Sequence, residues 1–117
     1  MSGGSEWPLE SRLEPVPGGA LFHVMGELDL LTAPALREQL RNALEAHGKI
    51  VVDCSNLDYI DVTGIRALEE TGQNYNARLA MIGSKPIVRK IFDILQLQSV
   101  IPIFPNREAA LNFLKGN

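Results

Sequence analysis

The chain of 117 residues has few of the residues and segments on which several protein classes depend. It contains one cysteine, Cys54, which excludes an internal disulfide and suits a reducing compartment. No apolar run approaches the roughly 20 residues that a membrane-spanning helix needs. Residues 1–5 have neither the basic nor the apolar region of a signal peptide. We therefore expect a cytoplasmic protein that does not insert into membranes.

Positive charge is also scarce and is spread along the chain. Eleven lysine and arginine residues stand against fourteen acidic ones, which gives a net charge of −3. No basic stripe with interleaved aromatic residues is present, so direct binding of nucleic acid is not expected. The two histidines, His23 and His47, are far apart and lack the spacing of metal ligands. The sequence therefore predicts neither a metal nor another cofactor.

What the chain does have is a regular alternation of short apolar segments with helical patterns. The segments that predict strands are residues 20–25, 49–54, 79–83 and 100–104, with 9–16 as a further edge strand. Gly26 is expected to end the first of these strands, and Cys54 the central one. Because Pro102 cannot donate a hydrogen bond to a neighbouring strand, the last strand is expected to lie at a sheet edge or to end early.

Helix signals fill the intervals between the predicted strands. Thr32 is the expected N-cap of a helix of about 14 residues that stops at Gly48. The predicted buried stripe of this helix is Ala33, Leu36, Leu40, Ala43 and Leu44. Ser84 is expected to cap a later helix, and Asn106 the last one. The buried stripes predicted for these two helices are Ile87, Ile91, Ile94 and Leu95, widened by Val88 and Phe92, and then Ala110, Leu111 and Leu114.

The order of these segments defines the fold class. Strands that alternate with helices pair in parallel through right-handed crossovers. The sequence therefore predicts a single α/β domain over residues 9–117, with a mostly parallel sheet of four to five strands and about four helices. Residues 1–8 are expected to form a flexible N-terminal tail.

One interval, residues 57–66, carries more polar chemistry than a connection needs. Asp61 is the expected N-cap of a helix, which places Val62, Thr63 and Gly64 in its first turn. The hydroxyl of Thr63 would then lie among unpaired backbone N–H groups, where a phosphoryl group is favourably held. A phosphate there adds about −1.5 to −2 charges beside Asp61 and would repel a partner docked over the loop. Taken alone, this spacing more often reflects plain helix capping.

Three motifs together resemble the STAS family, the sulfate-transporter and anti-sigma factor antagonist domain. They are Gly26-Glu27-Leu28-Asp29 with Thr32, then Val51-Val52-Asp53 with Leu57 and Ile60-Asp61-Val62-Thr63-Gly64, and finally Val88-Arg89-Lys90-Ile91-Phe92 with Leu95 and Leu97. The resemblance covers nearly all of the chain after residue 20. The combination of motifs favours a phosphorylation loop over plain capping.

The resemblance implies a non-enzymatic regulator of bacterial transcription, of the anti-sigma factor antagonist type. In that family a serine/threonine kinase that is also the anti-sigma factor phosphorylates the second hydroxyl position of the loop, here Thr63. The unphosphorylated form binds the kinase, the phosphorylated form does not, and a phosphatase resets the switch. A monomer or weak dimer is expected. The residues that the resemblance assigns to the partner contact are Asp29, Leu30, Asp61, Val62, Thr63, Gly64 and Arg66.

The sequence departs from the family pattern just after this loop. Val62 stands where the family usually has a small residue, and Thr63 where serine is more usual. Residues 65–77 are shorter and more polar than usual and include Gly72, and glycine in a helix interior costs about 1 kcal/mol relative to alanine. We therefore expect a short or broken second helix and an altered partner surface.

Other functions are compatible with parts of the pattern. Within the same family, the alternative functions are an accessory subunit of a lipid-transport ABC ATPase, whose loop would dock on the ATPase, and a scaffold component of a stress complex. A phosphotransferase would use Cys54 as its nucleophile, but a buried structural thiol is favoured because no glycine-rich phosphate cradle follows it. A receiver domain needs an acidic pair after its first strand, which Asp53, Asp58 and Asp61 do not supply.

Overall fold

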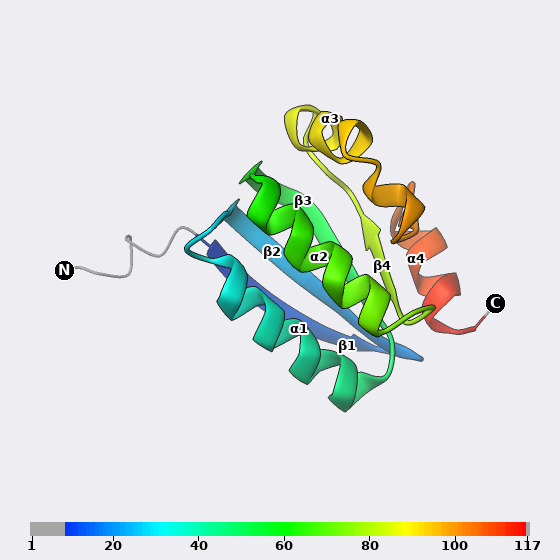
Figure 1. Ribbon diagram of the computed structural model, residues 1–117. Helices are drawn as coiled ribbons and strands as arrows, with labels where there is room; N and C mark the ends of the chain where they lie inside the picture. The colour runs from blue at the N-terminus through cyan, green and yellow to red at the C-terminus, as the bar shows by residue number, and fades with distance from the viewer. Residues whose placement is uncertain (1–8, 117) are drawn as a thin grey trace.

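The computed structural model describes residues 9–116 and contains one five-stranded sheet with helices on both faces (Figure 1). The strands lie in the order β1-β2-β3-β4-β5; β1 is antiparallel to β2, and the other neighbours are parallel. The elements in chain order are β1 (Leu9–Val16), β2 (Gly19–Leu28), α1 (Ala33–His47), β3 (Ile50–Ile60), α2 (Val62–Asn74), β4 (Leu79–Ile82), α3 (Pro86–Ile94), the short 3-10 helix η2 (Leu97–Ser99), β5 (Ile103–Phe104) and α4 (Arg107–Leu114).

The α/β fold class, the single sheet and its mostly parallel pairing are confirmed. Residues 1–8, predicted to form a flexible tail, lie outside the described residues. The described helices include none that is both long and apolar enough to cross a membrane. Because β2, β3, β4 and β5 run in the same direction, their carboxyl ends meet at one edge of the sheet, which we call the carboxyl edge.

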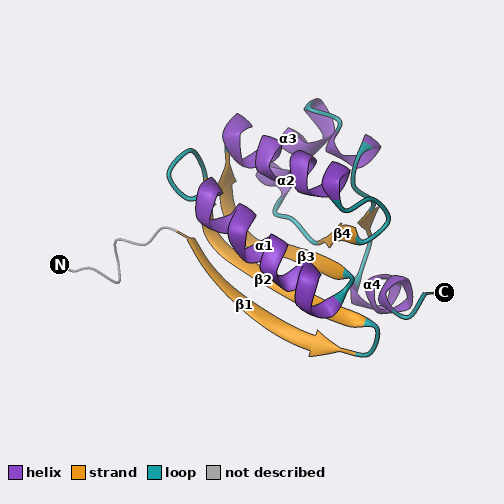
Figure 2. Cartoon of the chain, turned by 60° about the horizontal axis from the view of Figure 1, so that its bottom comes forward, coloured by secondary structure: helices purple, strands orange, loops and turns teal. Residues whose placement is uncertain are grey.

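The helices form two unequal layers around the sheet (Figure 2). α1, α2 and α3 enclose the larger core on one face, and α4 encloses a smaller core on the other. The largest fully buried side chains of the larger core include Phe92, Leu36, Leu40, Leu57, Ile60 and Leu68. The smaller core consists of Leu21, Val51, Ala80, Ile82, Ala110 and Leu114.

Strands β2 and β3 are longer than predicted. β2 continues past Gly26 to Leu28, and β3 continues past Cys54 to Ile60, so both predicted strand ends were wrong. The pairing runs on to Leu28 and Ile60 through a register shift next to Gly26, whose φ of 102° suits glycine. Only Leu57 and Ile60 are buried in the second half of β3, and exposed residues separate them, so this half has no apolar run that predicts a strand.

Both outer strands lie at sheet edges, but the last one is shorter than the predicted residues 100–104. β1 spans Leu9–Val16, as expected for the additional edge strand. β5 contains only Ile103 and Phe104 and lies at the opposite edge of the sheet, directly after Pro102. Pro102 thus marks a strand that is both at an edge and short, as its missing N–H predicts.

Helix α1 is built as the sequence predicted, apart from its cap. All five residues of its predicted stripe are buried, and Gly48 ends it with a φ of 84°. Thr32 occupies the N-cap position, but its side chain makes no capping hydrogen bond. Its hydroxyl accepts a hydrogen bond from the Asp29 N–H at 2.9 Å and donates to the Glu27 carbonyl oxygen at 3.0 Å. The hydroxyl therefore stabilises the loop before α1 rather than the helix itself.

Helix α2 contradicts the expectation of a short or broken helix, because it runs without interruption over 13 residues. Gly72 lies inside it and is buried. A Cβ added at Gly72 would come within 2.6 Å of Ile101 Cγ1, too close for a real contact. The glycine therefore lets α2 approach the segment before β5 closely, and this packing offsets its low helix propensity.

Helix α3 also differs from its prediction, because fewer of its apolar residues are buried than expected. Only Val88 and Phe92 are buried, whereas Ile87 and Ile94 are 62% and 67% exposed and Leu95, just after the helix, is 38% exposed. Lys85 takes the N-cap position instead of Ser84, without a side-chain capping bond. The prediction was right for Val88 and Phe92, and Ile91 packs partly buried against the core. It was wrong for Ile87, Ile94 and Leu95, because α3 is apolar on two sides and only packing decides which side faces the core.

The last helix, α4, begins and packs as predicted. The Asn106 side chain caps it by accepting a hydrogen bond from the Ala109 N–H at 2.9 Å. Ala110 and Leu114 are buried against the sheet, and Leu111 packs partly buried beside them.

Candidate functional site

The N-terminus of α2 lies at the carboxyl edge and is fixed by Asp61. One carboxylate oxygen of Asp61 accepts a hydrogen bond from the Gly64 N–H at 2.9 Å, which confirms the predicted N-cap. The Asp61 N–H donates to the Leu28 carbonyl oxygen at 3.1 Å. Val62, Thr63 and Gly64 therefore form the first turn of a helix whose start is tied to the end of β2.

The loop between β2 and α1 is held against the same aspartate. The second carboxylate oxygen of Asp61 accepts a hydrogen bond from the Leu30 N–H at 3.2 Å. Within the loop, an Asp29 carboxylate oxygen accepts from the Leu31 N–H at 2.9 Å and from the Thr32 N–H at 3.2 Å. The carboxylates of Asp29 and Asp61 thus organise the two loops that form this end of the molecule.

Gly64 allows these two segments to approach each other. A Cβ at this position would lie 2.7 Å from Leu28 Cγ, 2.8 Å from the Leu28 carbonyl oxygen and 2.9 Å from Ile60 Cγ1. No such contact is tolerated without movement of the backbone. A glycine is therefore required here for the close packing of α2 on the ends of β2 and β3, and not for its φ angle.

The structure brings together the residues that the sequence analysis assigned to partner binding. Thr63 is half-buried in the first turn of α2, and Val62 beside it is 52% exposed. Leu30 is exposed in the loop that Asp61 holds, and Arg66 is exposed on α2 three residues beyond Thr63. The geometry places these side chains at one end of the sheet, and their roles in binding and phosphorylation remain predictions.

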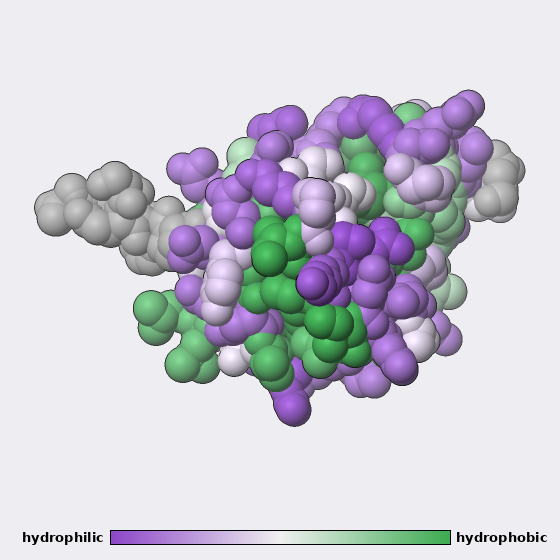
Figure 3. Space-filling model, turned by 90° about the horizontal axis from the view of Figure 1, so that it is seen from above, coloured by the Kyte–Doolittle hydropathy of each residue, from purple (hydrophilic) through white to green (hydrophobic). Residues whose placement is uncertain are grey.

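Apolar side chains also gather at this end, and of these only Leu30 and Val62 were among the predicted partner contacts. Figure 3 shows hydrophobic residues across the surface seen from above. Val62 and Leu95 line a shallow groove with Ile65, Arg66 and Glu69, between the start of α2 and the end of α3. Among the described residues, the large apolar side chains exposed near the carboxyl edge are Leu30, Leu31, Tyr59, Val62, Ile87, Ile94 and Leu95. We call these seven residues the carboxyl-edge surface.

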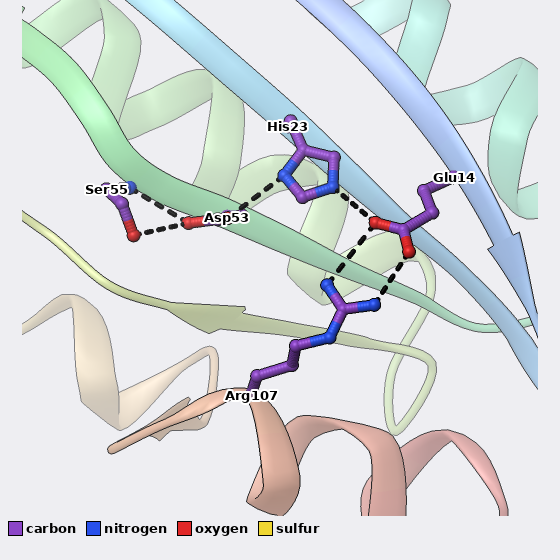
Figure 4. A network of polar contacts seen from close by, with 5 residues as sticks. All are labelled: Glu14, His23, Asp53, Ser55 and Arg107. Carbon is purple, nitrogen blue, oxygen red and sulfur yellow. Dashed lines mark hydrogen bonds and ion pairs between the residues drawn. The ribbon is translucent and has the colours of Figure 1, made fainter.

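A polar network lies on the face of the sheet that α4 covers (Figure 4). His23 Nδ1 lies 2.9 Å from an Asp53 carboxylate oxygen, and His23 Nε2 lies 2.8 Å from a Glu14 carboxylate oxygen. Arg107, at the start of α4, donates to the same Glu14 carboxylate at 2.6 and 3.3 Å. Ser55 donates to Asp53 through its hydroxyl at 2.6 Å. The network joins β1, β2, β3 and α4.

The hydrogen bonds of this network stabilise the ionised forms of its two carboxylates, Glu14 and Asp53. The hydrogen bond from Arg107 and that from His23 lower the pKa of Glu14 to about 2. Burial opposes ionisation of Asp53, but hydrogen bonds from Ser55 and His23 outweigh it and lower the pKa of this carboxyl group. The polar groups of these side chains satisfy one another's hydrogen-bonding capacity, so the network has a structural role: it links β1, β2, β3 and α4.

The three aspartates that could suggest a receiver-domain pocket have separate partners. Asp53 belongs to the network with His23, Asp61 caps α2, and Asp58 forms an exposed ion pair with Lys85. Within residues 9–116, no group of three histidine, cysteine or acidic side chains is arranged to hold a metal ion. The carboxylates therefore act in different local structures and do not form one acidic pocket.

Cys54 is unsuitable as a phosphotransfer nucleophile. It is fully buried in the larger core, in the middle of β3. Burial raises the pKa of its thiol well above the ordinary value. An inaccessible, protonated thiol is a packing residue, as the sequence favoured.

Comparison with known proteins identifies the family. Residues 12–110 match the STAS domain family, so the chain belongs to that family. A candidate anti-anti-sigma factor of Mycobacterium tuberculosis is 30% identical over 97 residues, which cover 78% of this chain and 66% of the relative. The chain thus spans just under two thirds of the length of that relative.

Solved structures show the same fold. An anti-sigma factor antagonist from Mycobacterium paratuberculosis superposes with a TM-score of 0.82 at 21% identity, covering 98% of this chain and 99% of that one. The anti-sigma factor antagonist SpoIIAA in its unphosphorylated form gives 0.73 at 21% identity, with 92% and 98% covered. The phosphorylated form of SpoIIAA, a cell fate determinant of Bacillus, gives 0.65 at 21% identity, with 88% and 97% covered.

Proposed function

We propose that this STAS domain is an anti-sigma factor antagonist of the bacterial cytoplasm that itself catalyses no reaction. It binds an anti-sigma factor kinase through the carboxyl-edge surface while Thr63 is unphosphorylated. Phosphorylation of Thr63 by that kinase releases the partner, and a phosphatase restores binding. The observation that carries the proposal is the position of Thr63, in the first turn of α2 at the carboxyl edge and next to exposed Val62, which lines a groove with Leu95.

The carboxyl-edge surface is suited to binding another protein. Leu31 is 83% exposed, and Ile87 and Ile94 are each more than 60% exposed, so a partner that covers them removes much apolar area from water. Burial of such area is worth about 25 cal/mol per Å² before the costs of association. The fixed loops held by Asp61 and Asp29 keep this surface in one shape, which reduces the ordering cost of binding.

A phosphate on Thr63 changes the same surface without unfolding the domain. The start of α2 carries unpaired backbone N–H groups and the positive end of the helix dipole, which favour an anion. The added charge of about −1.5 to −2 would lie beside Asp61 and near exposed Val62. A partner that had desolvated this region would then meet an uncompensated charge and dissociate. Relatives and structural neighbours that are anti-sigma factor antagonists support this assignment.

The direct test is incubation of the full chain with candidate anti-sigma factor kinases and ATP, followed by mass spectrometry of the intact protein. We expect the addition of one phosphate to the wild type and none to Thr63→Ala. Phosphate uptake by Thr63→Ala equal to that of the wild type would refute Thr63 as the acceptor.

Binding assays with the same variants test the switch itself. Thr63→Ala is expected to keep its affinity for the kinase, and Thr63→Glu is expected to weaken it because the glutamate places a charge in the docking surface. Equal affinities of the two variants would contradict the charge mechanism. If no kinase phosphorylates or binds the chain, while a transport ATPase or a stress-complex protein does, the function is constitutive docking.

A further inference from the structure

We propose that the outer edge of β1 pairs with β1 of a second copy of this chain, in one antiparallel register centred on Ser11. β1 has eight residues and, within the described part of the chain, a neighbouring strand on one side only (Figure 2). The other sheet edge offers no such opportunity, because β5 has two residues and is flanked by Pro102 and Pro105.

The direction of the backbone groups of β1 follows from its pairing with β2. The Ala20 N–H donates to the Lys49 carbonyl oxygen, on the β3 side of β2, so the backbone groups of Ala20 point away from β1. Pro15 is paired with Ala20, and the register is regular along all of β1. Since backbone groups alternate along a strand, the outward N–H and C=O groups belong to Leu9, Ser11 and Leu13.

The faces of β1 are equally well defined. The Ser11 hydroxyl donates to Gln39 of α1, so Leu9, Ser11 and Leu13 face the α1 side of the sheet. The Glu14 carboxylate reaches the network with Arg107, so the even-numbered residues Glu10, Arg12 and Glu14 face the α4 side. Both copies keep these faces when two β1 strands pair about a twofold axis perpendicular to the sheet.

A twofold axis at Ser11 makes the edge self-complementary. Ser11 then exchanges both backbone hydrogen bonds with Ser11 of the second copy, and Leu9 exchanges both with Leu13 of the second copy. Glu10 lies directly opposite Arg12 of the second copy, in the closely spaced kind of pair, and the symmetry repeats each contact. Leu9 is partly buried and Leu13 is 38% exposed, so their contact on the α1 side also removes apolar area from water.

The three registers centred on Arg12, Glu10 and Leu13 are less favourable. An axis at Arg12 places two arginines opposite each other, and one at Glu10 does the same with two glutamates. An axis at Leu13 requires backbone donors from Pro15, which has none, and sets Arg12 against Glu14, which already binds Arg107 and His23. Like charges directly opposite in a sheet are destabilising, so the pattern of the strand selects the axis at Ser11.

The test is sedimentation of the full chain over a range of concentrations, with charge variants on the exposed side of β1. We expect the wild type to dimerise, and Glu10→Arg and Arg12→Glu each to raise the dimer dissociation constant about tenfold. The double variant is expected to recover wild-type association. An equimolar mixture of the two single variants is expected to form mixed dimers, because each then supplies the charge that the other lacks.

A second pair of variants tests the backbone contact. Ser11→Pro removes an outward N–H that β2 does not use, so the domain should fold but not dimerise. Ser11→Ala loses only the hydroxyl contact to Gln39 and should dimerise as the wild type does. Circular dichroism confirms folding in each case.

Several results would overturn the proposal. These are a wild type that stays monomeric up to about 1 mM, charge variants that dimerise as the wild type does, a mixture that associates no better than its components, and a Ser11→Pro variant that is folded and dimeric. Phosphorylation of Thr63 and kinase binding are independent of this edge, so failure here does not bear on the switch.

Discussion

The carboxyl-edge surface and the Glu14–His23–Asp53–Arg107 network are parts of the same sheet that differ in how their side chains are satisfied. In the network, the polar groups bind one another, and the pKa of Glu14 and that of Asp53 are both lowered as a result. At the carboxyl edge, seven large apolar side chains remain exposed around a helix start that is itself tightly held. Satisfied polar groups indicate a structural role, whereas exposed apolar groups on a fixed frame indicate a surface that binds a partner.

The largest effect on stability is expected at Gly64, where the start of α2 packs closely on the ends of β2 and β3. Gly64→Ala places a methyl group within 3 Å of three atoms of Leu28 and Ile60, so we expect a loss of about 1–3 kcal/mol in the free energy of unfolding. Urea denaturation measures this loss, and Thr63→Ala in the same helical turn serves as the control with a smaller change. A Gly64→Ala variant as stable as the wild type would show that α2 is not tightly packed against Leu28 and Ile60.

A smaller loss of stability is expected when either of two helix N-caps, Asp61 or Asn106, is removed, and the two variants should differ in kinase binding. Asp61→Ala and Asn106→Ala each remove a side chain that accepts a backbone N–H at 2.9 Å, so each should cost about 1 kcal/mol of stability. Only Asp61 also holds the Leu30 N–H, so only Asp61→Ala should weaken kinase binding in calorimetric titrations. Equal losses of affinity in the two variants would mean that binding follows overall stability and not the carboxyl edge.

The network predicts a pH-dependent difference in stability. Because the pKa of Glu14 in the folded state is about 2 and its ordinary value is 4.5, its ionised form stabilises the fold above about pH 4.5. This contribution is lost as the pH falls from about 4.5 through about 2. We expect Glu14→Gln to be less stable than the wild type at neutral pH and to approach it in acid, as measured by thermal unfolding against pH. Glu38→Gln, the same substitution at an exposed position on α1, is the control in the same measurement.

The smallest effect on stability is expected where the functional effect is large. Ile94→Ser and Leu13→Ser replace exposed apolar residues, so each should change stability by no more than about 0.5 kcal/mol. Ile94 belongs to the carboxyl-edge surface and Leu13 does not, so only the first variant should weaken kinase binding in dilute solution. A normal affinity of Ile94→Ser would remove α3 from the proposed docking surface.

Helices α1 and α3 show how much periodicity alone could predict. In α1, the apolar residues form one stripe bounded by charged residues, and the structure buries that stripe as predicted. In α3, apolar residues occur on two sides, and periodicity could not choose between Phe92 and Ile94 as the buried residue. The choice depends on the sheet and on η2, which cover one side of α3 and leave the other exposed.

Local chemistry of the site was also predictable in part. Asp61 as an N-cap follows from its side chain and position, and the structure confirms its bond to Gly64. Its second bond, to the Leu30 N–H, joins segments 31 residues apart, and no local rule predicts it. The same holds for His23, which the sequence presented as an isolated histidine and the structure places between Glu14 and Asp53.

By itself, the sequence determined the order of strands and helices, the N-caps at Asp61 and Asn106, the family and the position of Thr63 at a helix start. These depend on residues close together in the chain, whose preferences are set by backbone dihedrals, hydrogen-bonding side chains and periodic burial. Only the tertiary structure decided that α2 continues through Gly72, that Ile87 and Ile94 of α3 face outward, and that a polar network links β1 to α4. Those outcomes depend on the space left between distant segments, and the free energy of packing outweighs local propensity there.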